Sequence, residues 1–136
     1  IGIGIWGYLA NEEEKKKYGE QLEESISLFS KVIHEKDWSG KIGYDLTQDT
    51  SGKIATIGIG YHDFLPLNMQ GYEFPNGDKI VGKICMCQTM LNIKGDEKEK
   101  EIFGKNNSIY EIAKYCDVSV YYLLSKIANR VIKERE

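Results

Sequence analysis

Four side chains, two cysteines, one histidine and one aspartate, could take part in metal binding or catalysis. Cys85-Met86-Cys87 places two thiols two positions apart, as in half of a thiolate metal site. His62 and Asp63 pair a base with a carboxylate that could orient it. A structural zinc site needs about four ligands with paired spacing, and nucleophilic catalysis needs a nucleophile within reach of the base. The sequence supplies neither at a recognised spacing, so we expect no metal site, cysteines that pack as small buried side chains, and a strand-end loop at His62-Asp63.

The glycines at the start of the chain form a second pattern with chemical meaning. Gly2, Gly4 and Gly7 spell G-x-G-x-x-G. A dinucleotide-binding fingerprint needs a strand before this pattern and a helix that opens at it. The sequence shows neither, so a dinucleotide site is not expected. Close packing, or backbone amides offered to a phosphate, are the two interpretations left open.

Length, charge and cysteine content narrow the class of protein. The chain has 136 residues, of which 41% are hydrophobic and 29% charged, the balance of one globular domain. The net charge of −3 gives no basic field for nucleic acid or an anionic membrane. No apolar run reaches the roughly 20 residues of a membrane span. An odd number of cysteines favours a reducing cytoplasm over a disulfide framework. Because the first residue is Ile1 rather than Met, we expect a piece of a longer protein or a processed chain.

Short strands and two late helices are expected to position these residues. The hydrophobic pattern predicts strands at 1–6, 25–35, 41–45, 53–61, 72–74, 79–85, 89–93 and 130–132. Turns are predicted at 49–52, at Asn76-Gly77 and over 95–101, and the charge run 11–17 predicts a solvated loop or helix turn. Ser108 and Ser119 are expected to cap two short helices. The fold class is therefore mostly β, an antiparallel barrel-like or sandwich-like domain with two short C-terminal helices.

Six short segments, in order along the chain, form a recognisable set. They are I-G-I-G-I-W-G (1–7), K-I-G-Y (41–44), I-G-I-G-Y-H-D (57–63), V-G-K-I-C-M-C-Q (81–88), S-I-Y-E-I-A-K (108–114) and I-A-N-R-V (127–131). They resemble the segments R-x-G-I-x-x-Y-G, V-x-Y-G, I-P-I-G-Y-A-D-G, V-G-R-I-C-M-D-Q, an E-I-A helix and I-S-x-R-V-P-R in the C-terminal half of alanine racemase, a fold-type III pyridoxal phosphate enzyme. The resemblance implies that residues 1–136 form the C-terminal β domain, with residues 1–10 a remnant of the missing N-terminal barrel.

The resemblance implies a function shared between two parts of a protein. Its N-terminal barrel would carry the Schiff-base lysine and pyridoxal 5'-phosphate, while this domain completes the active site of the partner subunit in a homodimer. Such an enzyme racemises a small amino acid, alanine or serine, from L to D for cell-wall biosynthesis. Tyr44 would move a proton on one face of the substrate Cα. A tyrosine with a pKa of about 10 is a poor base in water, so the site would have to stabilise its phenolate.

The other site positions also follow from the resemblance. Backbone amides of Gly2 and Ile3 would bind the cofactor phosphate, Tyr61 would line the substrate entrance, Met86 and Cys87 would lie near the substrate, and Asn129 would replace a phosphate-contacting tyrosine. An asparagine there resembles the serine racemases of vancomycin-resistance systems. Cys87, Phe64 and Leu67 replace the family's aspartate, glycine and arginine. These departures leave open an alternative, a degenerate non-catalytic module for dimerisation or partner contact.

Three expectations concern the behaviour of the chain. Without the barrel lysine, this chain alone is expected not to racemise amino acids. The apolar segment Ile1 to Trp6 is expected to make it self-associate, because large exposed apolar patches seek partners. The parent protein is expected to be cytoplasmic, or the cytosolic part of a membrane-anchored protein.

Overall fold

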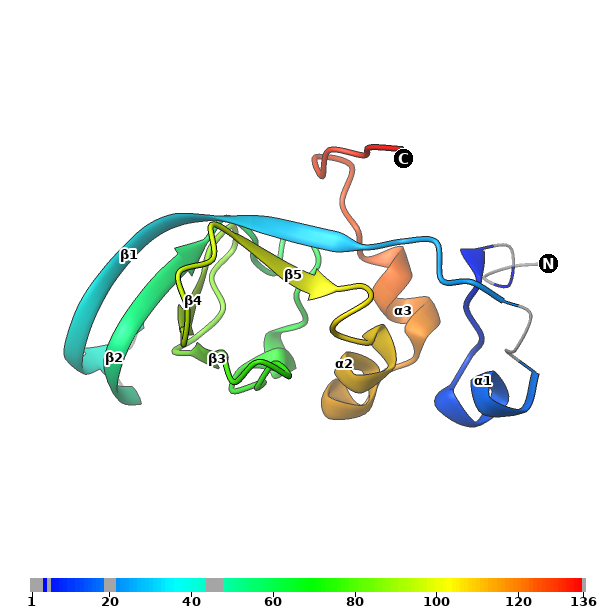
Figure 1. Ribbon diagram of the computed structural model, residues 1–136, viewed down its shortest axis with the longest axis horizontal. Helices are drawn as coiled ribbons and strands as arrows, with labels where there is room; N and C mark the ends of the chain where they lie inside the picture. Colours follow the sequence, from blue (N-terminus) through cyan, green and yellow to red (C-terminus); the bar gives the residue numbers. More distant parts are fainter. Residues whose placement is uncertain (1–3, 5, 19–21, 44–47, 136) are drawn as a thin grey trace.

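Five antiparallel strands form a single curved sheet, with the helices gathered at one end (Figure 1). The computed structural model describes residue 4 and residues 6–18, 22–43 and 48–135. Its elements are α1 (Glu12–Tyr18), β1 (Leu28–Ile42), β2 (Gln48–Ile57), the 3-10 helix η3 (Leu67–Met69), β3 (Lys79–Val81), β4 (Thr89–Asn92), β5 (Glu99–Phe103), α2 (Ile109–Cys116) and α3 (Val120–Ser125). The strand order is β3-β4-β2-β1-β5. The predicted fold class is confirmed, although five strands rather than eight occur in the described ranges.

The long hairpin of β1 and β2 corrects two predictions. The sequence suggested a separate strand at 41–45, but Lys41 and Ile42 are the last residues of β1. It also suggested a turn at 49–52, yet these residues pair with β1, with Gly52 opposite Trp38. The polar residues Asp49 to Ser51 read as a turn because both faces of this outer part of the hairpin are largely solvated, so no hydrophobic alternation marks it.

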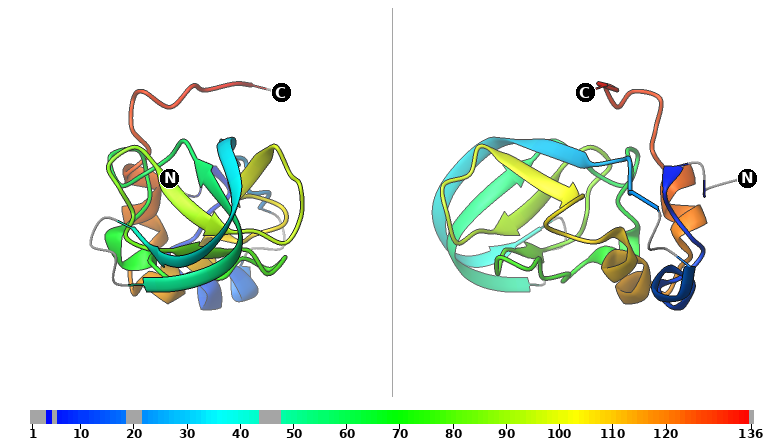
Figure 2. Two further views of the ribbon diagram at one scale, coloured as in Figure 1. Left: turned by 90° about the vertical axis from the view of Figure 1, so that its left-hand side faces the viewer. Right: turned by 45° about the vertical axis from the view of Figure 1, so that its right-hand side comes forward.

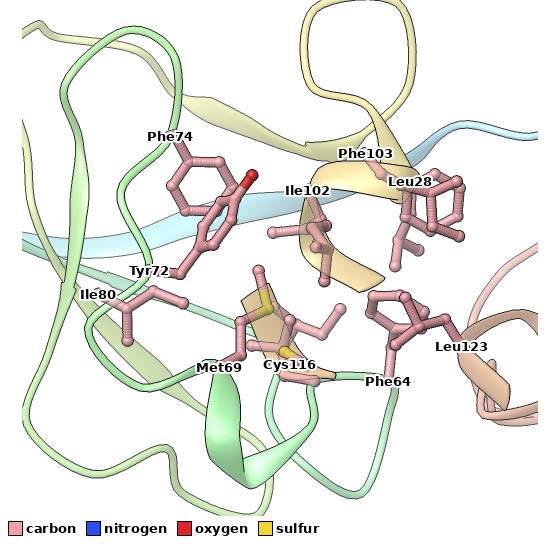
Figure 3. Packing of buried hydrophobic residues seen from close by; sticks show 14 of the residues in the cluster. Leu28, Phe64, Met69, Tyr72, Phe74, Ile80, Ile102, Phe103, Cys116 and Leu123 are labelled. Atoms are coloured by element: carbon pink, nitrogen blue, oxygen red, sulfur yellow. The ribbon is translucent and has the colours of Figure 1, made fainter. Parts of the chain in front are cut away.

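Alternation of buried and exposed side chains places the core under the first half of β1. Leu28 and Ser30 are buried while Phe29 and Lys31 are exposed, the period-2 pattern of a half-buried strand. The predicted inward face of this segment is therefore confirmed. Leu28 and Phe103 pack beside Ile102 and Phe64, and the close-up in Figure 3 shows these side chains converging on Leu123.

Residues 95–101, predicted as a turn, contain the start of β5. The strand pairs antiparallel with β1 and places Glu101 opposite Phe29. Its charged residues Glu99 and Lys100 concealed it, because Lys100 is a buried charge within a strand. The hairpin turn at Asn76-Gly77 is confirmed: Gly77 N–H donates to the Phe74 carbonyl at 2.9 Å, and Phe74 N–H donates to Asp78.

The two C-terminal helices begin where the sequence predicts. The Ser108 hydroxyl accepts from Tyr110 N–H at the start of α2, and the Ser119 hydroxyl accepts from Tyr122 N–H at the start of α3. Five of the eight residues of α2 are buried, so this helix closes the end of the core beside η3. Figure 2 shows both helices stacked at this end, with the last residues of the chain leading away from the body.

The described residues near the two ends of the chain do not form the predicted strands, and residues 1–3 and 5 of the predicted strand 1–6 lie outside the described part of the chain. Gly7 N–H donates to the Gly4 carbonyl at 3.1 Å, so Gly4 to Gly7 close a tight turn, and Trp6 is exposed. Residues 130–132 pair with none of the described strands. The charge run forms α1, a solvated helix with no buried residue, as one of the two predicted alternatives. No helix within the described ranges is long and apolar enough to cross a membrane.

Candidate functional site

The turn that follows β2 and the turn that follows β3 are joined by backbone hydrogen bonds. Tyr61 N–H donates to the Cys85 carbonyl at 3.0 Å, and His62 N–H donates to the Met86 carbonyl at 2.9 Å. The first turn closes on itself, since Asp63 N–H donates to the Gly60 carbonyl at 3.1 Å. Two of the six family-like segments are thus held together by backbone hydrogen bonds.

Gly60 lets these two turns approach closely. A Cβ atom at this position would overlap the carbonyl oxygens of Cys85 and Met86, which are backbone atoms and cannot rotate away. We expect Gly60→Ala to lower the free energy of unfolding by about 1–3 kcal/mol, the usual cost of an overpacked site. Urea denaturation of both proteins measures this difference. Gly95→Ala is the matched control, because a Cβ on Gly95 meets no atom within 4 Å; equal losses in the two variants would contradict the prediction.

The side chains predicted to line the substrate entrance or to lie near the substrate are exposed on these turns. Tyr61 is 43% exposed and Met86 is 51% exposed, although both are large apolar side chains. Cys87 is also exposed and Cys85 is half-buried, so the prediction of buried packing cysteines is wrong for this pair. It is confirmed for Cys116, whose burial raises the pKa of its thiol to about 11. The turns therefore hold Tyr61, Met86 and Cys87 on an accessible edge.

Asp63 ties the first turn to the segment after α3. Its side chain is buried, and its Oδ2 accepts from Gly60 N–H at 2.9 Å while Oδ1 accepts from Arg130. Its carbonyl oxygen accepts from Ala128 N–H at 2.9 Å. Burial raises the pKa of the Asp63 carboxyl, but the hydrogen bonds from Arg130 and Gly60 outweigh it, and the pKa lies below its ordinary value. The carboxylate is thus engaged with Gly60 and Arg130, as befits a loop at the end of a strand.

Asn129 lies between the two residues that contact Asp63. It is exposed, and its neighbours Ala128 and Arg130 hold it beside the turn that carries Tyr61. The structure therefore brings together four of the seven predicted site residues: Tyr61, Met86, Cys87 and, through Asp63, Asn129. The remaining three, Tyr44, Gly2 and Ile3, lie outside the described residues.

Gly43 and Gln48, the described residues on either side of 44–47, lie against Gly82. A Cβ on Gly43, which has a φ of +92°, would lie 3.2 Å from the Gly82 Cα. Gln48 Oε1 accepts from Gly82 N–H at 2.8 Å. Gly82 precedes Met86 by four positions, so the two residues that bracket this segment contact the stretch that leads to the Cys85–Cys87 turn.

The two other departures from the family pattern have different surroundings. Phe64 is fully buried and packs against Phe103, with ring centroids 5.3 Å apart. It belongs to the core and has no access to a ligand. Leu67 is 63% exposed on η3, so an apolar side chain faces solvent where the family has an arginine.

The described residues offer a donor for a cofactor phosphate but no complete cofactor site. The exposed side-chain amide of Asn129 can donate to a phosphate oxygen. A groove beside β1, β2 and β4, lined by residues that include His34, Trp38 and Met90, has a volume of about 190 Å³, below the roughly 300–1,000 Å³ of typical small-molecule pockets. Within the described ranges, no three His, Cys, Asp or Glu side chains lie together as metal ligands would.

Arg130 is the residue of this region that the sequence did not single out. It was part of a predicted strand and of the I-A-N-R-V segment, without a role of its own. Its partner Asp63 lies 67 positions earlier in the chain, a separation that no local pattern reveals. The joint occurrence of G-Y-H-D and N-R-V was the available signal.

Comparison with known proteins identifies the family. Residues 25–135 match the family model described as "Alanine racemase, C-terminal domain". The alanine racemase of Borreliella burgdorferi (strain ZS7) is 35% identical over 141 residues, which cover 94% of this chain and 38% of that protein. The crystal structure of alanine racemase from Bacillus anthracis with bound L-Ala-P has a TM-score of 0.85 at 29% identity, and the match covers 96% of this chain and 38% of that one.

A further solved structure shows the same fold at greater distance. Alanine racemase from Bartonella henselae, described with covalently bound pyridoxal phosphate, has a TM-score of 0.80 at 20% identity over 94% of this chain and 38% of that one. The chain spans about two fifths of the length of the curated relatives it matches. The resemblance to alanine racemase is confirmed, and the chain belongs to the family of alanine racemase C-terminal domains.

Proposed function

We propose that this chain is the C-terminal domain of a pyridoxal phosphate-dependent racemase that interconverts the L and D forms of alanine or serine. The observation that carries the proposal is the meeting of three family-like segments at one edge of the domain, through Tyr61–Cys85, His62–Met86 and Asp63–Ala128. Segments that only packed the core would have no reason to present Tyr61 and Met86 to solvent. An accessible edge of this kind suits a surface that closes over a site on another chain.

Each residue of this edge has a proposed task. Tyr44 gives or takes the proton on one face of the substrate Cα, and Tyr61 lines the entrance. The backbone amide of Met86 binds the substrate carboxylate, with Cys87 beside it. Gly2, Ile3 and Asn129 contribute contacts to the phosphate of the cofactor. Bound pyridoxal 5'-phosphate supplies an electron sink for the carbanion character that develops at Cα.

The rest of the active site is proposed to come from outside these residues. An N-terminal barrel would supply the lysine for the opposite face of Cα, and a second subunit would bring this edge over that barrel in a homodimer. The proposed setting is the cytoplasm, where D-amino acids are made for cell-wall precursors.

The test uses the full-length protein to which this domain belongs. Purified with pyridoxal phosphate, it is expected to show the visible absorbance of the protein-bound cofactor and to racemise L-alanine or L-serine, followed by chiral chromatography. A full-length protein that binds the cofactor but racemises neither amino acid would argue against this substrate class. One that does not bind the cofactor would contradict the proposal.

The chain of 136 residues on its own is expected to be inactive. Under the proposal, the lysine that holds the cofactor belongs to the barrel, and this domain supplies only one wall of the site. Incubation with pyridoxal phosphate and L-alanine should leave the substrate unchanged by chiral chromatography, with the full-length protein as the positive control. Cofactor-dependent appearance of D-alanine from the chain alone would show that its chemistry is self-contained.

Leu67 favours the alternative function, a non-catalytic module for dimerisation or partner contact. An exposed leucine at the position of a family arginine adds apolar surface and removes a charge, which suits a contact surface. Under this alternative the full-length protein forms a stable dimer by light scattering and binds no pyridoxal phosphate.

A further inference from the structure

We propose that Asp63 and Arg130 form a positioning pair that fixes the Asn129 segment against the turn carrying Tyr61, and so sets the affinity of the site for the cofactor phosphate. This inference rests on the proposed function for the identity of the ligand. The pair itself rests only on contacts within the described residues.

Asp63 joins the two segments through polar contacts of both its side chain and its backbone. Its carboxylate accepts from Gly60 N–H on its own turn and from Arg130 on the other segment, and its carbonyl oxygen accepts from Ala128 N–H at 2.9 Å. Only 2% of the Asp63 surface is exposed, so solvent cannot replace these hydrogen bonds if they are lost. Asn129 is flanked on both sides by residues that Asp63 holds.

The segment after α3 makes few other contacts with the rest of the domain. Ile127 and Val131 pack partly against the core, but Ile132 is 85% exposed and the described residues beyond it are exposed. Figure 2 shows the end of the chain leaving the body of the domain here. The Val131 N–H bond to the Ala128 carbonyl, at 3.1 Å, shapes a turn within the segment without tying it to the rest. Asp63 therefore supplies the polar contacts that place Asn129.

Arg130 joins the turn that carries Tyr61 to the segment that carries Asn129. Its hydrogen bond to Asp63 raises the pKa of its guanidinium above the ordinary value. Loss of the Arg130 side chain would free the Asn129 segment, while the bonds from Tyr61 and His62 to Cys85 and Met86 still hold the turns that carry Tyr61 and Cys87 together.

Because loss of Arg130 would free the Asn129 segment alone, it should change cofactor binding and not turnover. Asn129 is proposed to contact the cofactor, whereas Tyr61 and Met86 are proposed to face the substrate. In the full-length protein, Arg130→Ala is therefore expected to raise the dissociation constant for pyridoxal phosphate about tenfold. The kcat at saturating cofactor should stay within about threefold of wild type. General damage to the fold would raise the dissociation constant and lower kcat together.

The experiment combines cofactor titration by absorbance with amide hydrogen exchange of residues 127–131 in the full-length protein without cofactor. Arg130→Ala should speed exchange of the Ala128 amide about tenfold, and Arg130→Lys, which keeps the charge, should recover most of both effects. Arg135→Ala, a change at an exposed arginine of the same segment, is the control and should behave as wild type. If Arg130→Ala does not fold, Arg130→Gln removes the charge with a smaller loss of volume.

The outcomes separate this inference from the proposed function. Wild-type exchange at Ala128 in the Arg130→Ala or Arg130→Gln protein overturns the positioning pair. Faster exchange with unchanged cofactor affinity overturns its role at the phosphate. If the wild-type protein binds no pyridoxal phosphate, the proposed function fails, whereas the exchange measurement still decides whether the pair holds the segment.

Discussion

Tyr44→Phe in the full-length protein is expected to lower kcat for racemisation by a factor of about 10²–10⁴, the usual contribution of a positioned acid or base. The substitution removes only the phenolic oxygen and keeps the ring, so the packing of the side chain is preserved. Because the oxygen is proposed to carry the proton and not to bind the substrate, KM should change little. Steady-state kinetics in both directions measure the effect.

The same variant offers a sharper test by solvent deuterium exchange. Racemisation needs a base on each face of Cα, and the proposed lysine of the barrel remains in Tyr44→Phe. Exchange of the Cα hydrogen of one enantiomer should therefore persist while racemisation is lost. Tyr18→Phe, which removes the hydroxyl of an exposed tyrosine at the end of α1, is the control. An undiminished kcat in Tyr44→Phe would remove Tyr44 from the mechanism.

Lys100→Met is expected to destabilise the fold by about 3–5 kcal/mol, the cost of breaking a buried ion pair. Lys100 is 5% exposed and Asp78 is 3% exposed. Lys100 Nζ lies 2.8 Å from Asp78 Oδ2 and 3.1 Å from Asn76 Oδ1, and 4.2 Å from the centroid of the Phe74 ring. Methionine fills similar space but leaves the Asp78 carboxylate buried without its cation. Urea denaturation of the chain at neutral pH measures the loss.

Two further variants separate the effect of the buried charges from the effect of the changed side chain. Lys105→Met makes the same change at an exposed lysine and is expected to alter stability by less than about 0.5 kcal/mol. Adding Asp78→Asn to Lys100→Met removes the unpaired charge and should recover part of the loss. Equal stability of Lys100→Met and Lys105→Met would show that the buried pair contributes little.

At acid pH, the difference in the free energy of unfolding between Lys100→Met and wild type is expected to become smaller. Burial raises the pKa of the Asp78 carboxyl, but hydrogen bonds from Lys100, the Lys94 amide and Asn76 hold it below its ordinary value. Such a group stabilises the fold above its unfolded pKa of about 3.9, and this contribution is lost as pH falls through the lower native pKa. The wild type loses it on acidification, whereas the variant, with its unpaired carboxylate, gains from protonation. Denaturation at about pH 3 and pH 7 measures the change; a constant difference would contradict it.

The elements that the sequence predicted well are those fixed by short-range rules. Ser108 and Ser119 cap helices because a side-chain oxygen satisfies a free amide two or three residues away. The Asn76-Gly77 turn follows from a glycine at a φ of +92°. The inward face of 28–32 follows from period-2 alternation. Each of these signals lies within a few residues of the structure it determines.

The errors occur where partners far along the chain decide the structure. The polar residues 49–52 form a strand because β1 extends far enough to pair with them. Lys100 lies in a strand because Asp78, 22 positions earlier, neutralises it. Similarly, Tyr61, Met86 and Asn129 were predicted from a family resemblance. The contacts that bring them together, His62 to Met86 and Asp63 to Arg130, depend on the folded chain.

The division of β1 between two partners determines the order in which this sheet can be completed during synthesis. Its distal half pairs with β2, which ends at Ile57, so that hairpin can form once residue 57 has left the ribosome. Its first residues, from Leu28, must wait for β5, which ends at Phe103. Over that interval the nascent chain carries an open strand edge, the kind of surface on which chaperones and aggregation compete.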